Sequence, residues 1–295
     1  MRLRADWLNR VLNVPYVPIL GPAHPDQFTA EMFTDVFADI VTASRTSTAL
    51  PFDKDRRWSP RKTDTVLVDE IVHRPDHTII PTLSRRGGGT IKTFYYGHAP
   101  NLNDLRAATR HCCATYGAAN GRVVWFDTAE ATDVDRTRVL LKEFTHDDQP
   151  DEPSGSPTVG ELDDYEPETA ATFSDFAHAM ADHGFAYLHQ RRNAGHHDGP
   201  VLVSQDNGVI VGAIGPLTIM PDRTGGRMLL PQYFGVLPEH RGGGHGRALW
   251  HAAQRWGARH HADYQLLQAR VGAASDNLFL SEGLRSLGFT ATVAA

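Results

Sequence analysis

The sequence predicts an α/β protein in which helices alternate with the strands of mixed sheets. Three observations support this prediction. Strand-like segments at 77–83 and 90–96 are joined by a glycine-rich connection. Asn207-Gly208 separates two further strand-like segments, and this dipeptide is the strongest short signal for a β-hairpin. Residues 227–271 have the pattern of a strand, a glycine loop, a helix and a second strand, a crossover that makes its two strands parallel.

Length and composition limit the classes of protein that fit. The 295 residues suffice for one large domain or two ordinary ones, and 41% hydrophobic residues with 22% charged residues are typical of globular chains. A formal net charge of -6 argues against nucleic-acid binding, which needs a basic face. No apolar run approaches the ~20 residues of a membrane span, and the first twenty residues lack the apolar core of a secretory signal. Cys112 and Cys113, the only cysteines, are adjacent, so we expect no disulfide framework and predict a cytoplasmic location.

Residues 1–148 are predicted to form an N-terminal mixed α/β domain of unknown role. Besides the two strands named above, apolar spacing and β-branched residues predict helices at 28–41, 101–116 and 133–144 and strands at 65–72 and 122–126. In the connection between the strands at 77–83 and 90–96, Arg85 and Arg86 precede three glycines. A hairpin turn is the favoured interpretation, and a second phosphate site is the alternative.

Residues 149–157 are predicted to be an acidic, proline-rich linker, which places the C-terminal domain at 158–295. In that domain the patterns predict strands at 159–162, 201–205, 209–219, 227–236 and 264–271, and helices at 168–181, 185–191, 247–259 and 277–287, the last closed by Gly288. His196, His197 and Asp198 are adjacent in a loop, where a metal site is the alternative, but no third partner lies nearby. We interpret them as a solvated loop and predict no metal site.

The loop Arg241-Gly242-Gly243-Gly244-His245-Gly246 lies between a predicted strand and a predicted helix. A glycine loop that opens a helix leaves backbone N–H groups without partners, and the positive end of the helix favours an anion there. The Gly-Lys-Ser/Thr ending of a P-loop and the dinucleotide fingerprint are both absent. The alternative is an ordinary strand-to-helix turn with surplus glycine.

Val236-x-Pro238-x-x-Arg241-x-x-Gly244-x-Gly246 closely resembles the acyl-CoA pyrophosphate loop of the GNAT superfamily of N-acetyltransferases. A second stretch resembles another motif of the family, in which an Asn opens the last helix and Gly-Phe closes it eleven and twelve residues later; here these are Asn277, Gly288 and Phe289. The order of predicted elements in 158–295 is also that of the GNAT fold. The resemblance covers the C-terminal half only. For the N-terminal domain a degenerate second copy of the fold is an alternative, although no such glycine loop supports it.

The resemblance implies acetyl-CoA as cosubstrate. The pyrophosphate would be held by the backbone of the glycine loop, the pantetheine arm would pair with the main chain of the preceding strand, and Asn277 would hydrogen-bond the arm. The implied cofactor-binding residues are Val236, Leu237, Arg241, Gly242, Gly243, Gly244, His245, Gly246, Arg247 and Asn277. Pro231 and Gly235 suit a strand that the family splays or bulges so that the thioester can enter.

The sequence departs from the family where catalytic side chains are usual. Leu284 stands where many members have a tyrosine acid, and Leu230 stands where some have a glutamate base. The candidate catalytic residues are therefore Tyr233, then Gln232, with Glu282 and Ser281 after them.

The predicted function is transfer of an acetyl group to a primary amine by direct attack in a ternary complex. The acceptor would be a small molecule such as an amino sugar, an amino acid or a peptide-type antibiotic. It would bind between the two halves of the chain, or near Phe173 and the 193–199 loop. A non-catalytic acyl-CoA sensor or scaffold is the main alternative, and an enzyme for longer acyl chains or an oxygen acceptor is a third.

Overall fold

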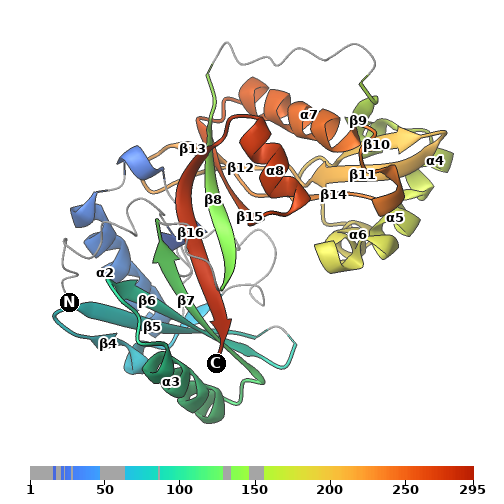
Figure 1. Cartoon of the computed structure of the whole chain (residues 1–295). Coiled ribbons are helices and arrows are strands. Elements are labelled where there is room, and N and C mark those ends of the chain that lie inside the picture. The colour runs from blue at the N-terminus through green and yellow to red at the C-terminus, as the bar shows by residue number, and fades with distance from the viewer. Residues whose placement is uncertain are drawn as a thin grey trace. The chain divides into compact units, whose positions relative to one another are not determined.

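The structure is a computed structural model that describes residues 16–17, 21–22, 24–27, 29–46, 64–85, 87–128, 134–145 and 156–295 (Figure 1). Its contacts divide into two compact units. Unit 1 comprises Met1–Lys142, Asp222–Gly226 and Leu266–Ala295, and unit 2 comprises Glu143–Pro221 and Arg227–Gln265. Neither unit follows chain order, and the predicted linker falls largely outside the described residues, so the division into 1–148 and 158–295 stays a prediction. In the described residues, no helix is long and apolar enough to cross a membrane.

Unit 1 contains a mixed sheet whose neighbouring strands run in the order β15–β8–β16–β7–β6–β5–β3, with β4 also paired to β5. The boundary between the units falls inside β15, after Gln265. The elements of unit 1 are β1 (Tyr16–Val17), β2 (Gly21–Pro22), η1 (Pro25–Gln27), α2 (Ala30–Thr46), β3 (Thr65–Val66), η4 (Val68–Glu70), β4 (Val72–His73), β5 (His77–Ser84), β6 (Thr90–Gly97), α3 (Leu102–Tyr116), β7 (Asn120–Asp127), β8 (Asp135–Glu143, its last residue in unit 2), the end of β15 (Tyr264–Arg270), α8 (Ala274–Ser281) and β16 (Arg285–Ala294).

Most predicted elements of the N-terminal half are confirmed. β5 and β6 form an antiparallel hairpin, and β6 pairs in parallel with β7 through the crossover helix α3, which packs on both strands. The predicted strand 65–72 is interrupted: its ends are β3 and β4, and the 3-10 helix η4 lies between them.

Two predictions for this sheet were wrong. The helix predicted at 133–144 is instead the strand β8 over its described part, with Val139, Leu140 and Leu141 all buried. A short apolar run fits a buried strand as well as a helix. The last helix ends at Ser281, not at 287. Gly283 (φ 76°) stops it, and Gly288 lies in β16 at a register shift instead of capping a helix.

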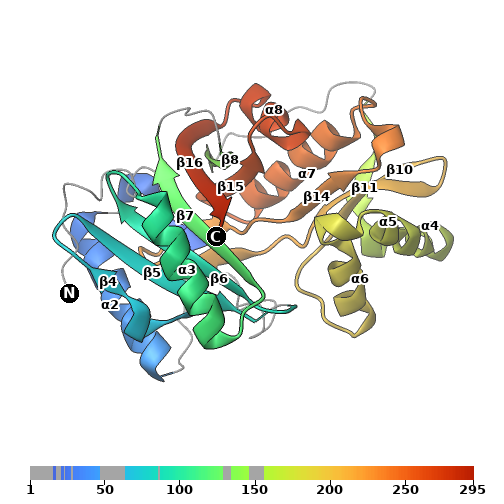
Figure 2. The same cartoon turned by 60° about the horizontal axis from the view of Figure 1, so that its bottom comes forward.

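Unit 2 contains the four-stranded antiparallel sheet β14–β11–β10–β9 and the short strands β12 and β13 beside the start of β15. Figure 2 shows α7 on one side of β10, β11 and β14, and helices α4, α5 and α6 on the other. Its elements are β9 (Val159–Glu161), η5 (Leu162–Asp164), α4 (Pro167–Ala171), α5 (Phe173–Ala179), η6 (Ala181–His183), α6 (Phe185–Asn193), β10 (Leu202–Asp206), β11 (Val209–Gly215), β12 (Ile219–Pro221), β13 (Arg227–Leu229), β14 (Tyr233–Val236), η7 (Pro238–His240) and α7 (His245–Arg259).

Glycines allow the helices to approach both faces of this sheet. A Cβ on Gly212 of β11 would lie 2.9 Å from Leu249 Cδ1 of α7, and a Cβ on Gly235 of β14 would lie 2.5 Å from Met180 Cε, which follows α5. Gly235 therefore serves close packing against the helices rather than a bulge.

The predicted hairpin is confirmed: β10 pairs with β11, and Asn207 (φ 50°) and Gly208 (φ 81°) form its turn.

The predicted strand 227–236 is divided between the two sheets. β13 pairs in parallel with β15, whereas β14 pairs antiparallel with β11. Pro231 stands between the two parts, where it removes a backbone donor from the ladder. The strand thus diverges from β15 after Leu229, just before it reaches the glycine loop.

Candidate functional site

The glycine loop joins β14 to α7 and is exposed from Arg241 to Gly244. Gly242 (φ 86°) and Gly244 (φ 85°) have left-handed backbone conformations that other residues rarely adopt, and Gly244 is the N-cap of α7. No side chain caps this helix. Gly244 has no side chain that could bind the first N–H groups of the helix, and the helix dipole favours an anion at this end.

The side chain of His245, the first residue of α7, is held in place by the buried hydroxyl of Ser204. Ser204 of β10 is 0% exposed, and its Oγ lies 2.7 Å from His245 Nδ1. Burial lowers the pKa of His245, and the nearby charge of His240 lowers it further, while Asp206 acts in the opposite direction. The rings of His240 and His245 meet edge to face, with centroids 6.1 Å apart. Neither Ser204 nor His240 was singled out from the sequence, because the hairpin that brings β10 beneath the loop is a tertiary feature.

The strand before the loop has an open edge. In the described sheet β14 has only one neighbour, β11, and Leu237 N–H donates to Val211 O at 2.9 Å. Since successive residues of a strand direct their amides to opposite sides, Val236 faces the open edge. Its carbonyl oxygen accepts a hydrogen bond from Arg241 Nε at 3.2 Å. Such an edge can accept an added extended chain that carries amide groups.

Tyr233 and Gln232 lie at the far end of this edge from the loop, and both make internal contacts. The Tyr233 ring packs against Phe185, with centroids 6.1 Å apart, and rests on Gly184, where a Cβ would lie 2.4 Å from Tyr233 Cε1. Gln232 Nε2 donates to the carbonyl oxygen of Leu230, and its Oε1 accepts from Gln265 Nε2 at 2.8 Å. The Gln232 amide is thus held in place by its neighbours.

The remaining predicted site residues belong to unit 1. Asn277 is exposed on α8, and Glu282 follows that helix, with its N–H bonded to Leu278 O. The buried pair Arg138–Asp276, with Nε and Oδ1 2.8 Å apart, fixes the start of α8 beside Asn277. Leu230 and Leu284, which replace the usual base and acid, are both buried.

The corresponding crossover in the N-terminal half has a different helix start. Asn101 is the N-cap of α3, and its Oδ1 accepts from the N–H groups of Asn103 and Asp104 at 3.2 and 3.4 Å. Asp104 also adds negative charge to the first turn. The helix end that is open in α7 is therefore occupied in α3 by the protein's own side chains.

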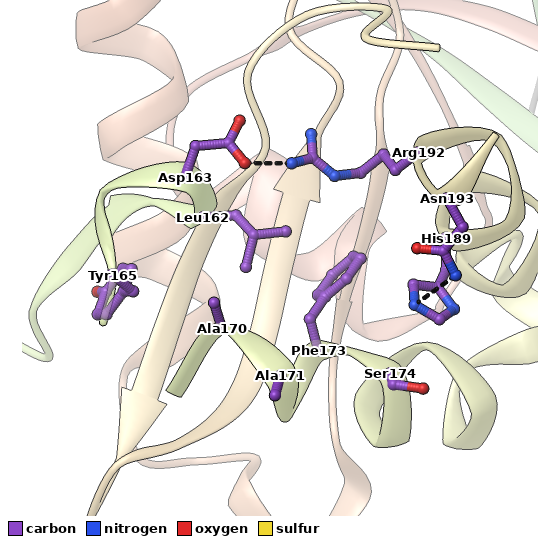
Figure 3. A pocket seen from close by; sticks show the side chains of 10 residues that line it. All are labelled: Leu162, Asp163, Tyr165, Ala170, Ala171, Phe173, Ser174, His189, Arg192 and Asn193. Carbon is purple, nitrogen blue, oxygen red and sulfur yellow. Dashed lines mark hydrogen bonds and ion pairs between the residues drawn. The ribbon is translucent and has the colours of Figure 1, made fainter. Parts of the chain in front are cut away.

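A cavity of about 350 Å³ lies between the end of β9 and helices α4, α5 and α6 (Figure 3). Arg192 and Asp163 form an ion pair on one side of it, and Asn193 Nδ2 lies 3.2 Å from His189 Nε2 on another. The cavity lies where the sequence suggested an acceptor near Phe173. However, the rings of Phe176 and Phe185 connect Phe173 to Tyr233 in succession, so core side chains separate this cavity from β14.

Two weaker sequence alternatives are also placed by the structure. The connection between β5 and β6 is a hairpin turn with left-handed Gly87 and Gly89, while Arg86 lies outside the described residues. In the 193–199 loop the Asp198 carboxylate is bound by Arg191 through two hydrogen bonds of 2.6 and 2.7 Å.

Residues 162–279 match the family model described as "Acetyltransferase (GNAT) family". A tandem GNAT protein from the clavulanic acid biosynthesis pathway is 12% identical, with a TM-score of 0.51, and the match covers 98% of this chain and 94% of that one. A GCN5-related N-acetyltransferase from Sphaerobacter thermophilus (15% identity, TM-score 0.45, 74% and 79% covered) and one from Kribbella flavida (15%, 0.45, 76% and 88%) are also similar. No curated protein matches.

The tandem protein shares its fold with the whole chain, so the likeness includes the N-terminal half, whose β6–α3–β7 crossover lacks the glycine loop. The family match falls on the half that contains that loop. Residues 162–279 of this chain therefore form an acetyltransferase domain of the GNAT family.

Proposed function

We propose that this protein transfers an acetyl group from acetyl-CoA to a primary amine of a small molecule, by direct attack of the amine in a ternary complex. The family and fold support acyl transfer in general. The observation that carries the finer proposal is the glycine loop: two left-handed glycines and an uncapped helix start form an anion site directly beside the open edge of β14. Acetyl-CoA would supply an activated acyl thioester.

The loop residues fit a pyrophosphate. A Cβ at Gly242 would meet nothing within 4 Å, so the space above the loop is open, and the N–H groups from Gly242 to Gly246 with that of Arg247 supply donors. Arg241 and Arg247 are exposed beside them and add positive charge. The four residues of β14 span about 13 Å. An extended pantetheine arm could therefore run from the loop past Leu237 and Val236 to Tyr233.

Main-chain N–H near Val236, on the open edge, would stabilise the oxygen of the thioester as charge develops on it. We propose that Tyr233 orients the reacting groups and that Asn277 of α8 hydrogen-bonds the pantetheine arm. Glu282, which follows α8, is a further candidate catalytic residue. Since Leu230 and Leu284 are buried and apolar, they supply neither base nor acid. The acceptor amine would therefore lose its proton to water. Its nitrogen would bond to the thioester carbon, the C–S bond would break, and the departing CoA thiolate would take a proton from a side chain or from water.

This chemistry favours an acceptor with a low amine pKa. An amine of pKa ~10.4 is neutral only about once in 10³ molecules at pH 7, which adds roughly 4–5 kcal/mol to the barrier, whereas an α-amine near ~8 adds about 1 kcal/mol. We therefore propose amino acids, amino sugars or peptide-type antibiotics as acceptors. The cysteine usage supports the further proposal of a cytoplasmic location. The alternative, an acyl-CoA sensor without turnover, is favoured by the same two leucines.

The test combines binding with turnover. Calorimetry with acetyl-CoA establishes the ligand, and release of free thiol is followed against a panel of amines of graded pKa. Micromolar binding with turnover that rises with pH through the pKa of the amine supports the enzyme. Binding without turnover against every amine supports the sensor, and absence of binding overturns both.

A further inference from the structure

Three glutamine side chains form a hydrogen-bonded chain at the point where the segment 227–236 leaves β15, before the glycine loop. Gln254 Nε2 on α7 donates to Gln265 Oε1 on β15 at 3.1 Å, and Gln265 Nε2 donates to Gln232 Oε1 at 2.8 Å. Gln232 Nε2 continues to the carbonyl oxygen of Leu230. We call these three residues the glutamine chain. Gln254 and Gln265 are 5% and 0% exposed, so both amides lie in the interior of unit 2.

The glutamine chain begins where the backbone ladder ends. Leu229 and Gln265 are the last paired residues of β13 and β15. Beyond them the chain leaves β15, and β14 pairs with β11 instead. The Gln265 side chain makes the next connection, to Gln232, three residues past Leu229. A side-chain bridge thus replaces the missing backbone hydrogen bonds across the divergence.

The glutamine chain carries a cost in stability. Gln254 Oε1 is buried and has no hydrogen-bond partner among the described residues, and an unsatisfied buried acceptor is costly. Three apolar side chains of similar volume would avoid this cost, because replacing every member of a buried polar network is often neutral or stabilising. A buried polar network can, however, fix one packing geometry, because its hydrogen bonds are directional.

We propose that the glutamine chain is a brace within unit 2 that fixes the start of β14 relative to Gln265 and α7, and so positions the acyl end of the cosubstrate at the end of the β14 edge. This inference rests on the proposed function. Gln265 and Gln232 are positioning residues: they act through the strands that they connect and need no contact with the reacting atoms. This assigns Gln232 a different role from the catalytic one suggested by the sequence.

The test compares CoA with acetyl-CoA. For Gln265→Leu we expect CoA affinity within about twofold of wild type, because the glycine loop is unchanged, and KM for acetyl-CoA within about twofold. The turnover number, read as free thiol with the best panel amine, should fall about tenfold, as expected for loss of one hydrogen bond worth about 1.4 kcal/mol. Gln268→Leu, an exposed glutamine on the same strand, is the matched control and should match wild type.

Gln232→Leu is the second variant, because Gln232 is half-buried and its replacement leaves β15 intact. It should show the same selective loss of turnover, and the double variant should lose no more than the worse single one. Turnover at the wild-type rate in both single variants overturns the brace. Equal losses of CoA affinity and turnover overturn it too, since they indicate general disruption. Wild-type protein that binds neither CoA nor acetyl-CoA overturns the proposed function itself.

Discussion

Replacing Gly244 with aspartate places a carboxylate at the uncapped start of α7 without a steric clash. The nearest atom to a Cβ at this position is Pro157 Cδ at 3.5 Å, an ordinary contact. The left-handed backbone (φ 85°) adds a strain of about 1–2 kcal/mol for a residue other than glycine. A carboxylate about 4 Å from one phosphate charge is repelled by about 4 kcal/mol at an effective dielectric constant of ~20. We therefore expect Gly244→Asp to stay folded and to lose acetyl-CoA affinity by about 100-fold or more.

Calorimetry with acetyl-CoA measures this loss, and thermal unfolding shows that the variant is folded. Gly195→Asp is the matched control, because Gly195 is left-handed (φ 79°), lies in unit 2 and has open space around it. It adds the same charge and a similar strain away from the loop, so its affinity should stay near wild type. Equal affinities of the two variants would refute the argument that the helix start holds the pyrophosphate.

Three further predictions concern the structure around the site. Asp276→Ala breaks the buried pair with Arg138 and should lower the free energy of unfolding in urea by about 3–5 kcal/mol. Asp135→Ala, which breaks an exposed pair with Arg270, should lower it by less than about 1 kcal/mol. Similar losses in the two variants would contradict the stronger role of the buried pair. Gly184→Ala places a methyl group against the Tyr233 ring at a left-handed position, so it should lower the free energy of unfolding by about 2–4 kcal/mol. Gly208→Ala, left-handed but in open space, should lower it only by its backbone strain of about 1–2 kcal/mol. Equal losses would exclude the ring contact. Because the folded pKa of His245 is lowered, the unfolded chain takes up its proton first as pH falls below ~6.5. The stability that neutral His245 contributes is thus present above that pH and lost below it. Below that pH the slope of Tm against pH should be smaller in His245→Gln than in wild type. An unchanged slope would refute the lowered pKa of His245.

The glycine loop could be predicted because its information is local. Gly242 and Gly244 need left-handed backbone conformations, and the residue pattern that meets this need is visible in the sequence. The Asn207-Gly208 hairpin was predictable for the same reason. The parallel pairing of β13 with β15 followed from the strand–helix–strand order, which permits few connections.

Elements that depend on distant partners could not be predicted in this way. Strand β8 lies between β15 and β16, so its apolar residues are buried on both faces and lose the alternation that identifies a strand. The helix predicted to reach 287 failed because β16 pairs with β7 and β8, which precede it by more than 130 residues. The glutamine chain was missed because Gln232, Gln254 and Gln265 come from three elements and share no sequence pattern.

The two crossovers in the chain show why only one of them is expected to bind acyl-CoA. Helix α3 leads from β6 to its parallel partner β7. Helix α7 follows β14 and leads to β15, the parallel partner of the earlier strand β13, so both helices start beyond the end of a strand. In α3 the side chain of Asn101 satisfies two N–H groups, which typically stabilises a helix by about 1 kcal/mol. In α7 glycines stand in the corresponding place, and that stabilisation is absent. Water satisfies the N–H groups of an exposed, uncapped helix start until a ligand replaces it. We therefore expect acetyl-CoA to bind at the start of α7 and stabilise unit 2 in thermal unfolding, and not to bind at the start of α3.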